Sequence, residues 1–122
     1  MDKKLIYVAD DDASILELME LILTGKGYEV ITSNDGRSLQ TLTNKPDLVF
    51  LDIGMSDTDG SEICRSFKNK NHQESAPVIL VSANDNLVEI AEDCGADDTL
   101  AKPFDVKAVV ELAQRYTTKG NK

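Results

Sequence analysis

Short apolar runs alternate with helical segments along the chain, and this alternation restricts the fold more than any other feature. The runs occupy residues 5–9, 28–32, 48–51, 77–81 and 99–101. Between the first two runs, apolar side chains recur at helical spacing, at Ile15, Leu18, Met19, Ile22 and Leu23. The runs at 5–9, 48–51 and 77–81 lack polar alternation, which is typical of strands buried on both faces. The pattern therefore predicts an α/β fold with a five-stranded parallel sheet and helices on both faces.

Capping residues and glycines set the expected limits of the helices. Asp12 is suited to cap the first helix, and Gly25 and Gly27 are suited to end it. Another helix is expected to begin at Asp59 and Gly60. The remaining helices are expected over residues 87–94 and 106–116, with Gly95 ending the former. Residues 34–44 are expected to form a weak helix, because only Leu39 and Leu42 offer apolar side chains to bury.

Length and charge indicate one domain over residues 1–122, with a polar tail at 117–122 that is expected to fray. Lysine and arginine number 13 against 22 aspartate and glutamate, a net charge of −9, which disfavours direct binding to nucleic acid or anionic membranes. No apolar run approaches the roughly 20 residues of a membrane span. Cys64 and Cys94 are too few for a disulfide framework and fall on apolar helix faces, so we expect core thiols in a reduced, cytoplasmic protein.

Polar side chains follow four of the apolar runs. Asp10 and Asp11 follow the first run, Asp52 the third, Ser82 the fourth and Lys102 the fifth. In an open parallel sheet, ligands bind beyond the carboxyl ends of the strands, where the strand order reverses. Periodicity alone leaves the strand order open. In the flavodoxin-like order 2-1-3-4-5 the first and third strands are neighbours, and the aspartates then converge.

Converging carboxylates repel one another unless a cation lies among them, and oxygen ligands favour Mg²⁺. A lysine and a hydroxyl beside such a site are donors for an anionic group. Together these groups suit phosphoryl transfer, with one carboxylate as the nucleophile. Taken singly, each has an ordinary structural reading: a helix cap for the aspartates, a strand-end hydroxyl for Ser82, a surface lysine for Lys102. Only their shared position at strand ends points to a site.

Several motifs occur in a characteristic order along the chain. They are IYVADDD at residues 6–12, PDLVFLDIGM at 46–55, DG at 59–60, PVILVSA at 77–83, GADD at 95–98 and KPF at 102–104. In this order and spacing, the motifs resemble those of response-regulator receiver domains of two-component signalling, over essentially the full length of the chain.

The resemblance implies a flavodoxin-like sheet in the order 2-1-3-4-5 and a role for each matching residue. Asp52 would accept a phosphoryl group from a partner's phosphohistidine. Magnesium would be held by Asp10, Asp11, Asp52 and the backbone carbonyl of Gly54. The phosphoryl-binding and switch residues would be Ser82, Ala83 and Lys102, and the bond between Lys102 and Pro103 would be cis.

The chain departs from the family pattern in three places. Ser56 stands where the family usually has proline, which loosens the loop without removing a chemical group. Thr99 stands where the family usually has the aromatic residue that moves with the switch hydroxyl, so the output switch is atypical. The segment between Ser82 and Gly95 is shorter than usual, so the helix within it is expected to be short or displaced.

The resemblance implies a phosphoacceptor rather than a turnover enzyme, with self-catalysed phosphorylation and dephosphorylation. Because the chain ends just past the last helix, we expect a stand-alone regulator or a phosphorelay intermediate, with a domain excised from a larger protein as the alternative. Its partners would be a sensor histidine kinase or a histidine phosphotransfer protein, and a downstream protein target. One alternative is a receiver-like interaction module that is not phosphorylated. Another is a haloacid-dehalogenase-like phosphatase, which residues 10–14 superficially match but which leaves Asp52 without a role.

Overall fold

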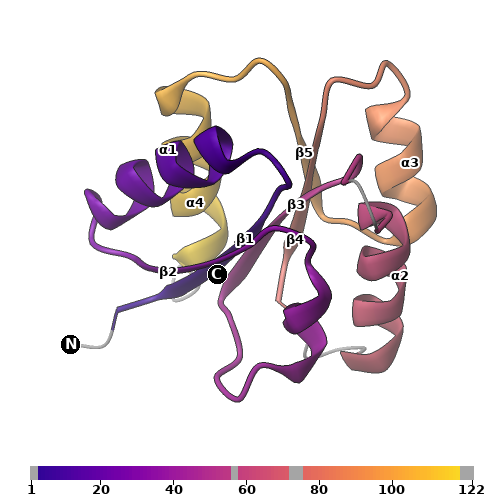
Figure 1. Cartoon of the computed structure of the whole chain (residues 1–122), viewed down its shortest axis with the longest axis horizontal. Helices are drawn as coiled ribbons and strands as arrows, with labels where there is room; N and C mark the ends of the chain where they lie inside the picture. Colours follow the sequence, from indigo (N-terminus) through magenta and orange to yellow (C-terminus); the bar gives the residue numbers. More distant parts are fainter. Residues whose placement is uncertain (1–2, 56–57, 72–75, 119–122) are drawn as a thin grey trace.

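Five parallel strands form the centre of the molecule in the order β2-β1-β3-β4-β5 (Figure 1). The structure, a computed structural model, describes residues 3–55, 58–71 and 76–118. The strands are β1 (Leu5–Ala9), β2 (Glu29–Ser33), β3 (Leu48–Asp52), β4 (Val78–Ser82) and β5 (Asp98–Ala101). The predicted fold class and strand order are therefore confirmed.

Helices cover both faces of this sheet (Figure 1). They are α1 (Ala13–Thr24), α2 (Gly60–Asn71), α3 (Leu87–Cys94) and α4 (Val106–Thr117), with a short 3₁₀ helix, η1 (Arg37–Thr41). Residues of α1 and α4 pack on one face, and residues of η1, α2 and α3 pack on the other. The site residues lie at the carboxyl ends of the strands, between these two layers.

Successive side chains of each strand point to opposite faces of the sheet and pack into two separate cores, one on each face. In β1, Ile6 and Val8 face α1 and α4, whereas Tyr7 and Ala9 face η1, α2 and α3. All five residues of β3 are buried. Burial on both faces explains why the runs at 5–9, 48–51 and 77–81 contain no polar alternation.

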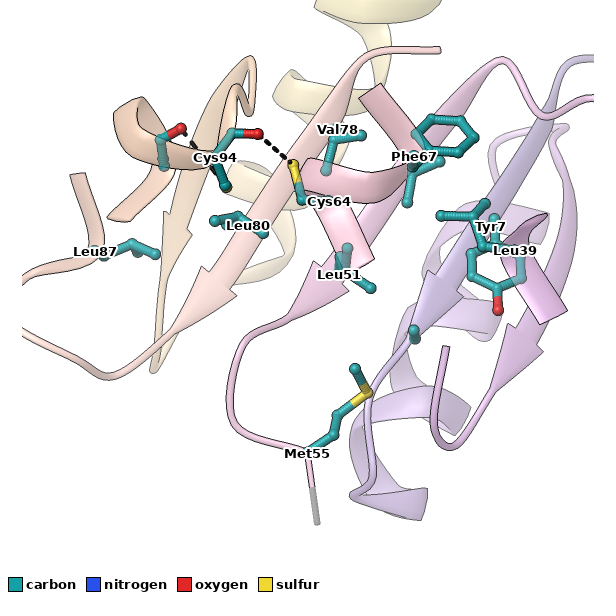
Figure 2. Packing of buried hydrophobic residues seen from close by; sticks show 13 residues of the cluster. Tyr7, Leu39, Leu51, Met55, Cys64, Phe67, Val78, Leu80, Leu87 and Cys94 are labelled. Carbon is teal, nitrogen blue, oxygen red and sulfur yellow. Dashed lines mark hydrogen bonds between the residues drawn. The ribbon is translucent and has the colours of Figure 1, made fainter. Parts of the chain in front are cut away.

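The core between the sheet and η1, α2 and α3 contains the two cysteines (Figure 2). Cys64 of α2 and Cys94 of α3 are free thiols and are buried, as the sequence predicts. The Cys64 thiol donates a hydrogen bond of 3.6 Å to the Cys94 carbonyl oxygen, which joins α2 to α3.

Among the described residues, none of the helices is long and apolar enough to cross a membrane.

The prediction of a weak helix over residues 34–44 is wrong in length and type. Only the five residues of η1 are helical, and they form a 3₁₀ helix. Gly36 precedes η1 with a φ of 75°, a conformation that favours glycine. Leu39 is buried, but Leu42 is already extended. A single buried apolar side chain gives too little packing energy to sustain a longer helix.

The expected fraying from residue 117 is also wrong at Thr117, which is the last residue of α4 and is buried. Its hydroxyl donates to the Ala113 carbonyl oxygen at 2.7 Å and lies 3.1 Å from the Tyr28 hydroxyl. These bonds attach the end of α4 to the chain before β2. Residues 119–122 and Ser56 lie outside the described residues.

Candidate functional site

The carboxyl ends of β1, β3 and β5 bring acidic and basic side chains together. Asp10 directly follows β1, Asp52 is the last residue of β3, and Lys102 follows β5. Asp10 is 2% exposed and Asp52 is 5% exposed, whereas Asp11 is exposed. Carboxylate oxygens of Asp10, Asp11 and Asp52 lie within 4.8 Å of one another. We call these three residues the acidic cluster.

Lys102 extends into the acidic cluster from β5. Its Nζ atom lies 3.1 Å from Asp10 Oδ2 and 3.5 Å from Asp52 Oδ1. Burial alone would lower the pKa of Lys102, but the hydrogen bond and charge of Asp10, followed by those of Asp52, raise it above its usual value. Lys102 is therefore a fixed positive charge at neutral pH. The Lys102–Pro103 peptide bond is cis.

The pKa of Asp52 is raised from its usual value. Burial is the main cause and the neighbouring charge of Asp10 is the next, and together they outweigh Lys102 and a backbone hydrogen bond from Gly54. Three carboxylates thus share the ammonium that Lys102 supplies. A further cation at this position would lower the energy of the ionised cluster.

Local hydrogen bonds orient Asp10. Its backbone N–H donates to the Ser33 carbonyl oxygen at 3.1 Å, which continues the pairing of β1 with β2. Asp10 Oδ1 accepts the Asp12 N–H at 2.9 Å, and the Asp12 side chain in turn caps α1 by accepting the Ser14 N–H at 2.9 Å. One carboxylate oxygen of Asp10 thus shapes the loop, and the other faces Lys102.

The loop after β3 turns sharply back to α2. The Ile53 N–H donates to the Val81 carbonyl oxygen at 3.1 Å, and Gly54 forms an antiparallel bridge with Asp59. The Thr58 hydroxyl donates to the Asp35 carbonyl oxygen at 2.7 Å, which ties this loop to the loop after β2. Gly54 is exposed and its N–H bonds to Asp52, so it lies beside the acidic cluster.

The predicted switch residues lie at the ends of β4 and within β5. Ser82 is the last residue of β4, directly after Val81, which pairs with Asp52. The Ser82 hydroxyl accepts the Asn84 N–H at 2.9 Å, and Ala83 beside it is exposed. Thr99 lies within β5, opposite Leu80 and three residues before Lys102. The structure thus brings Asp10, Asp11, Asp52 and Lys102 together and places Ser82 at the neighbouring strand end.

The donor set of the acidic cluster fits a hard divalent cation. Three carboxylates offer oxygen ligands within a few ångströms, and the backbone of Gly54 is close by. Oxygen ligands of this kind suit Mg²⁺, which binds through few carboxylates and retains water. Asp52 is central to this arrangement, so the structure disfavours the phosphatase alternative, in which Asp52 has no role.

One residue at the site is missed by the sequence pattern. Gly60 is expected only to begin a helix, yet its backbone packs against the backbone of Asp52. The signals in the sequence are the DG pair at 59–60, which is one of the motifs shared with receiver domains, and a glycine at a first helical position, where residues with higher helix propensity are usual.

Comparisons with known proteins agree with this geometry. Residues 6–114 match the response regulator receiver domain family. The alkaline phosphatase synthesis transcriptional regulatory protein PhoP of Bacillus subtilis is 35% identical over 113 residues, which cover 89% of this chain and 46% of that protein. The chain thus spans about half the length of the curated relatives it matches.

Solved structures show the same architecture. The receiver domain of NtrX from Brucella abortus is 34% identical and superposes with a TM-score of 0.78. The match covers 92% of this chain and 97% of that chain. A CheY-like receiver domain protein from Methanospirillum hungatei has a TM-score of 0.86 at 22% identity, covers 98% of both chains, and supports the fold alone. Strand order, acidic cluster and sequence match agree: the chain belongs to the response regulator receiver domain family and is a phosphoacceptor module of the two-component type.

Proposed function

We propose that Asp52 is the phosphoacceptor of this module and takes its phosphoryl group from a phosphohistidine on a partner protein. The observation that carries the proposal is the burial of Asp52 among carboxylates and within 3.5 Å of the Lys102 ammonium, at the carboxyl end of the sheet. An Asp52 oxygen attacks phosphorus as the bond from phosphorus to the histidine nitrogen breaks. The electron pair of that bond returns to the imidazole.

The neighbouring residues support this transfer. Mg²⁺ would be held by Asp10, Asp11, Asp52 and the Gly54 carbonyl, and when bound it would offset the charge of the phosphoryl oxygens. Lys102 pairs with one phosphoryl oxygen, since its ammonium already faces Asp52. The Ser82 hydroxyl donates to another, which withdraws it from the Asn84 N–H. Ala83 follows Ser82 in the same loop and moves with it.

Movement of the Ser82 loop is the proposed output. The loop leads into α3, so phosphorylation shifts the face formed by α3, β5 and α4, where a downstream protein binds. Two arrangements of this face pre-exist, and the phosphoryl group favours one of them. Thr99 lacks the aromatic ring usual at its position, so the shift is transmitted through the loop and α3 rather than through a ring.

We further propose the partners and location. The phosphoryl donor is a sensor histidine kinase or a histidine phosphotransfer protein. Loss of the phosphoryl group to water resets the module, so the chain acts as a switch rather than as a turnover enzyme. A cytoplasmic location is supported by the relative named DNA-binding response regulator MtrA, because bacterial DNA lies in the cytoplasm.

The test is intact mass after incubation with Mg²⁺ and a small-molecule phosphodonor. Wild-type protein is expected to gain one phosphoryl group only with Mg²⁺, and Asp52→Asn is expected to gain none. Asp93→Asn is the matched control, since Asp93 is an exposed aspartate of α3 outside the acidic cluster. It is expected to be labelled like the wild type.

The interaction module without phosphorylation predicts a different outcome. Wild-type protein would then bind Mg²⁺ and remain unlabelled even with a histidine kinase that phosphorylates other receivers. Asp52→Asn would also leave partner binding unchanged. That combination of results would contradict the phosphoacceptor role of Asp52.

A further inference from the structure

We propose that Gly60 is a positioning residue for the phosphoacceptor: the backbone at the start of α2 holds the peptide that carries Asp52, and only glycine permits that contact. The inference rests on the proposed function of Asp52. It gives the glycine of the Asp59–Gly60 pair a role beyond starting a helix.

The contact between Gly60 and Asp52 is between backbones. Gly60 is the first residue of α2 and is buried. A Cβ atom at this position would lie 2.0 Å from the Asp52 carbonyl oxygen and 2.8 Å from the Asp52 carbonyl carbon. It would also lie 2.9 Å from the Ile53 Cα atom. Backbone atoms cannot rotate away as a long side chain can, so any side chain at residue 60 must displace β3 or α2.

The backbone of Ile53, the residue directly after Asp52, is held from two directions. On the β4 side, the Ile53 N–H donates to the Val81 carbonyl oxygen at 3.1 Å. On the α2 side, the Gly60 N–H donates to the Ile53 carbonyl oxygen at 3.0 Å. The Asp52 carboxylate projects from this fixed backbone to within 3.5 Å of Lys102 Nζ. The start of α2 therefore sets where the acceptor oxygens lie relative to Lys102.

Asp59 contacts the neighbouring backbone of Gly54, the proposed carbonyl ligand of Mg²⁺. Gly54 forms an antiparallel bridge with Asp59, the residue directly before Gly60. Asp59 Oδ1 accepts the Ser61 N–H at 2.9 Å and the Ser61 hydroxyl at 2.7 Å, which holds the first turn of α2 in place. Asp59 and Gly60 thus connect the position of α2 to both Asp52 and Gly54.

The first experiment compares phosphorylation rates of wild type, Gly60→Ala and Gly25→Ala at saturating Mg²⁺ and phosphodonor. A displacement of about 1 Å at reacting groups commonly slows a reaction by ~10-fold or more, and we expect at least this loss in Gly60→Ala. Gly25→Ala is the matched control, because Gly25 follows α1 with a φ of −63° that alanine accepts, far from the acidic cluster. It is expected to react at the wild-type rate.

Two further readouts separate positioning from a general loss of stability. Amide chemical shifts of magnesium-free Gly60→Ala are expected to change around residues 52–54 and to stay unchanged around Thr117. Sucrose favours the folded state and restores a rate lost through unfolding. We expect it not to restore the rate of Gly60→Ala, and recovery in sucrose would overturn the inference.

A second pair of variants tests the inference even if Gly60→Ala does not fold. Asp59→Ala and Asp59→Asn remove the same charge, but only asparagine retains an oxygen to accept the Ser61 N–H. Asp59→Ala is expected to slow phosphorylation, and Asp59→Asn to restore the wild-type rate. Equal rates in both would overturn the inference.

The outcomes also separate this inference from the proposed function. If wild-type protein is never labelled on Asp52, the proposed function is wrong and the inference fails with it. If wild-type and folded Gly60→Ala are labelled at the same rate, the inference alone is wrong and the phosphoacceptor role of Asp52 stands.

Discussion

Asp10 and Asp52 are buried side by side, and both contact Lys102. Burial, followed by the charge of Asp10, raises the pKa of Asp52 above its usual 3.8. A raised pKa in the folded state means that the native protein binds this proton more tightly than the unfolded chain does. The contribution of Asp52 to stability therefore falls as pH rises from 3.8 through the folded-state pKa, and ionised Asp52 destabilises the fold at neutral pH.

The first prediction is that Asp52→Asn stabilises the magnesium-free protein at pH 7. Asparagine has the same shape without the charge, so the repulsion from Asp10 is lost. We expect a gain of roughly 1 kcal/mol, or ~3–5 °C in Tm for a domain of this size. Thermal unfolding at pH 7 and pH 4 measures it, and the gain should shrink at pH 4, where Asp52 takes up a proton. No gain at pH 7 would contradict the repulsion.

The second prediction concerns Lys102, which is 24% exposed and contacts two buried carboxylates. Lys102→Met keeps the length of the side chain but leaves Asp10 and Asp52 without that ammonium. We expect a loss of about 2–3 kcal/mol in the free energy of unfolding, below the range for fully buried pairs because Lys102 is partly solvated. Urea unfolding measures the change.

A double variant tests this assignment. Adding Asp52→Asn to Lys102→Met removes one of the carboxylates left unpaired, so part of the lost stability should return. The coupling between the two positions is expected to be at least about 0.5 kcal/mol. Additive effects would mean that Lys102 and Asp52 do not interact in solution.

At the scale of elements, α2 is attached to the sheet at its far end by Lys68 and Asp97. Lys68 Nζ lies 2.6 Å from Asp97 Oδ2 and donates to the Ala76 carbonyl oxygen at 3.2 Å. The same Asp97 oxygen accepts the Val78 N–H, the first of β4, at 2.8 Å. A single carboxylate thus joins α2, β4 and the start of β5.

The third prediction follows from this junction. Asp97→Ala leaves the Val78 N–H and the Lys68 ammonium without their acceptor, and it should cost about 1–3 kcal/mol in the free energy of unfolding. Asp97→Asn keeps an oxygen for Val78 and loses only the charge, so its loss should be smaller. Chemical denaturation of the two variants in parallel measures the difference. Equal losses would show that the hydrogen bond to Val78 contributes nothing.

Elements with strong local signals were predictable from the sequence. The buried runs gave the strands to within a residue or so, because strands buried on both faces need continuous apolar side chains. Asp12 and Gly25 marked the limits of α1, and Gly95 the end of α3, because caps act over a few residues. Residues 34–44 had no comparable signal, since η1 depends on the packing of Leu39 into the core that it shares with α2 and α3 rather than on local preference.

Contacts between distant segments were predictable only as far as the strand order. Once β1 and β3 are neighbours, Asp10 and Asp52 must converge, and the family resemblance supplied that order. The packing of Gly60 on Asp52 and the bond from the Asn84 N–H to Ser82 depend on how loops close in three dimensions. Neither the hydrophobic periodicity nor the capping residues of the sequence predict these two contacts.

At the scale of the whole molecule, the two cores share one sheet, so neither can open without disturbing the other. Cys64 and Cys94 lie in one of these cores, so the reactivity of their thiols measures how often that core opens. Burial, followed by the proximity of Cys94, raises the pKa of the Cys64 thiol, so the reactive thiolate is scarce in the folded protein.

The fourth prediction is that both thiols react with a thiol-specific reagent only when the domain unfolds. At pH 8 without denaturant, labelling should be slower than in urea by a factor of at least ~10³, the scale set by global opening of a stable domain. The rate should also rise in Lys102→Met, which destabilises the fold far from either cysteine. Fast labelling of the native protein would mean that α2 and α3 separate locally.

The acidic cluster and the lysine beside it come from residues 10, 11, 52 and 102, which span most of the chain, and the lysine comes last. During synthesis on the ribosome, Asp52 emerges well before Lys102. A growing chain therefore carries the carboxylates before it has the ammonium that compensates them or the strand that presents it. Premature termination before β5 would leave a fragment that has Asp10, Asp11 and Asp52 but lacks Lys102 and the strand that presents it. Only a chain made through Lys102 can therefore assemble the acidic cluster together with its ammonium.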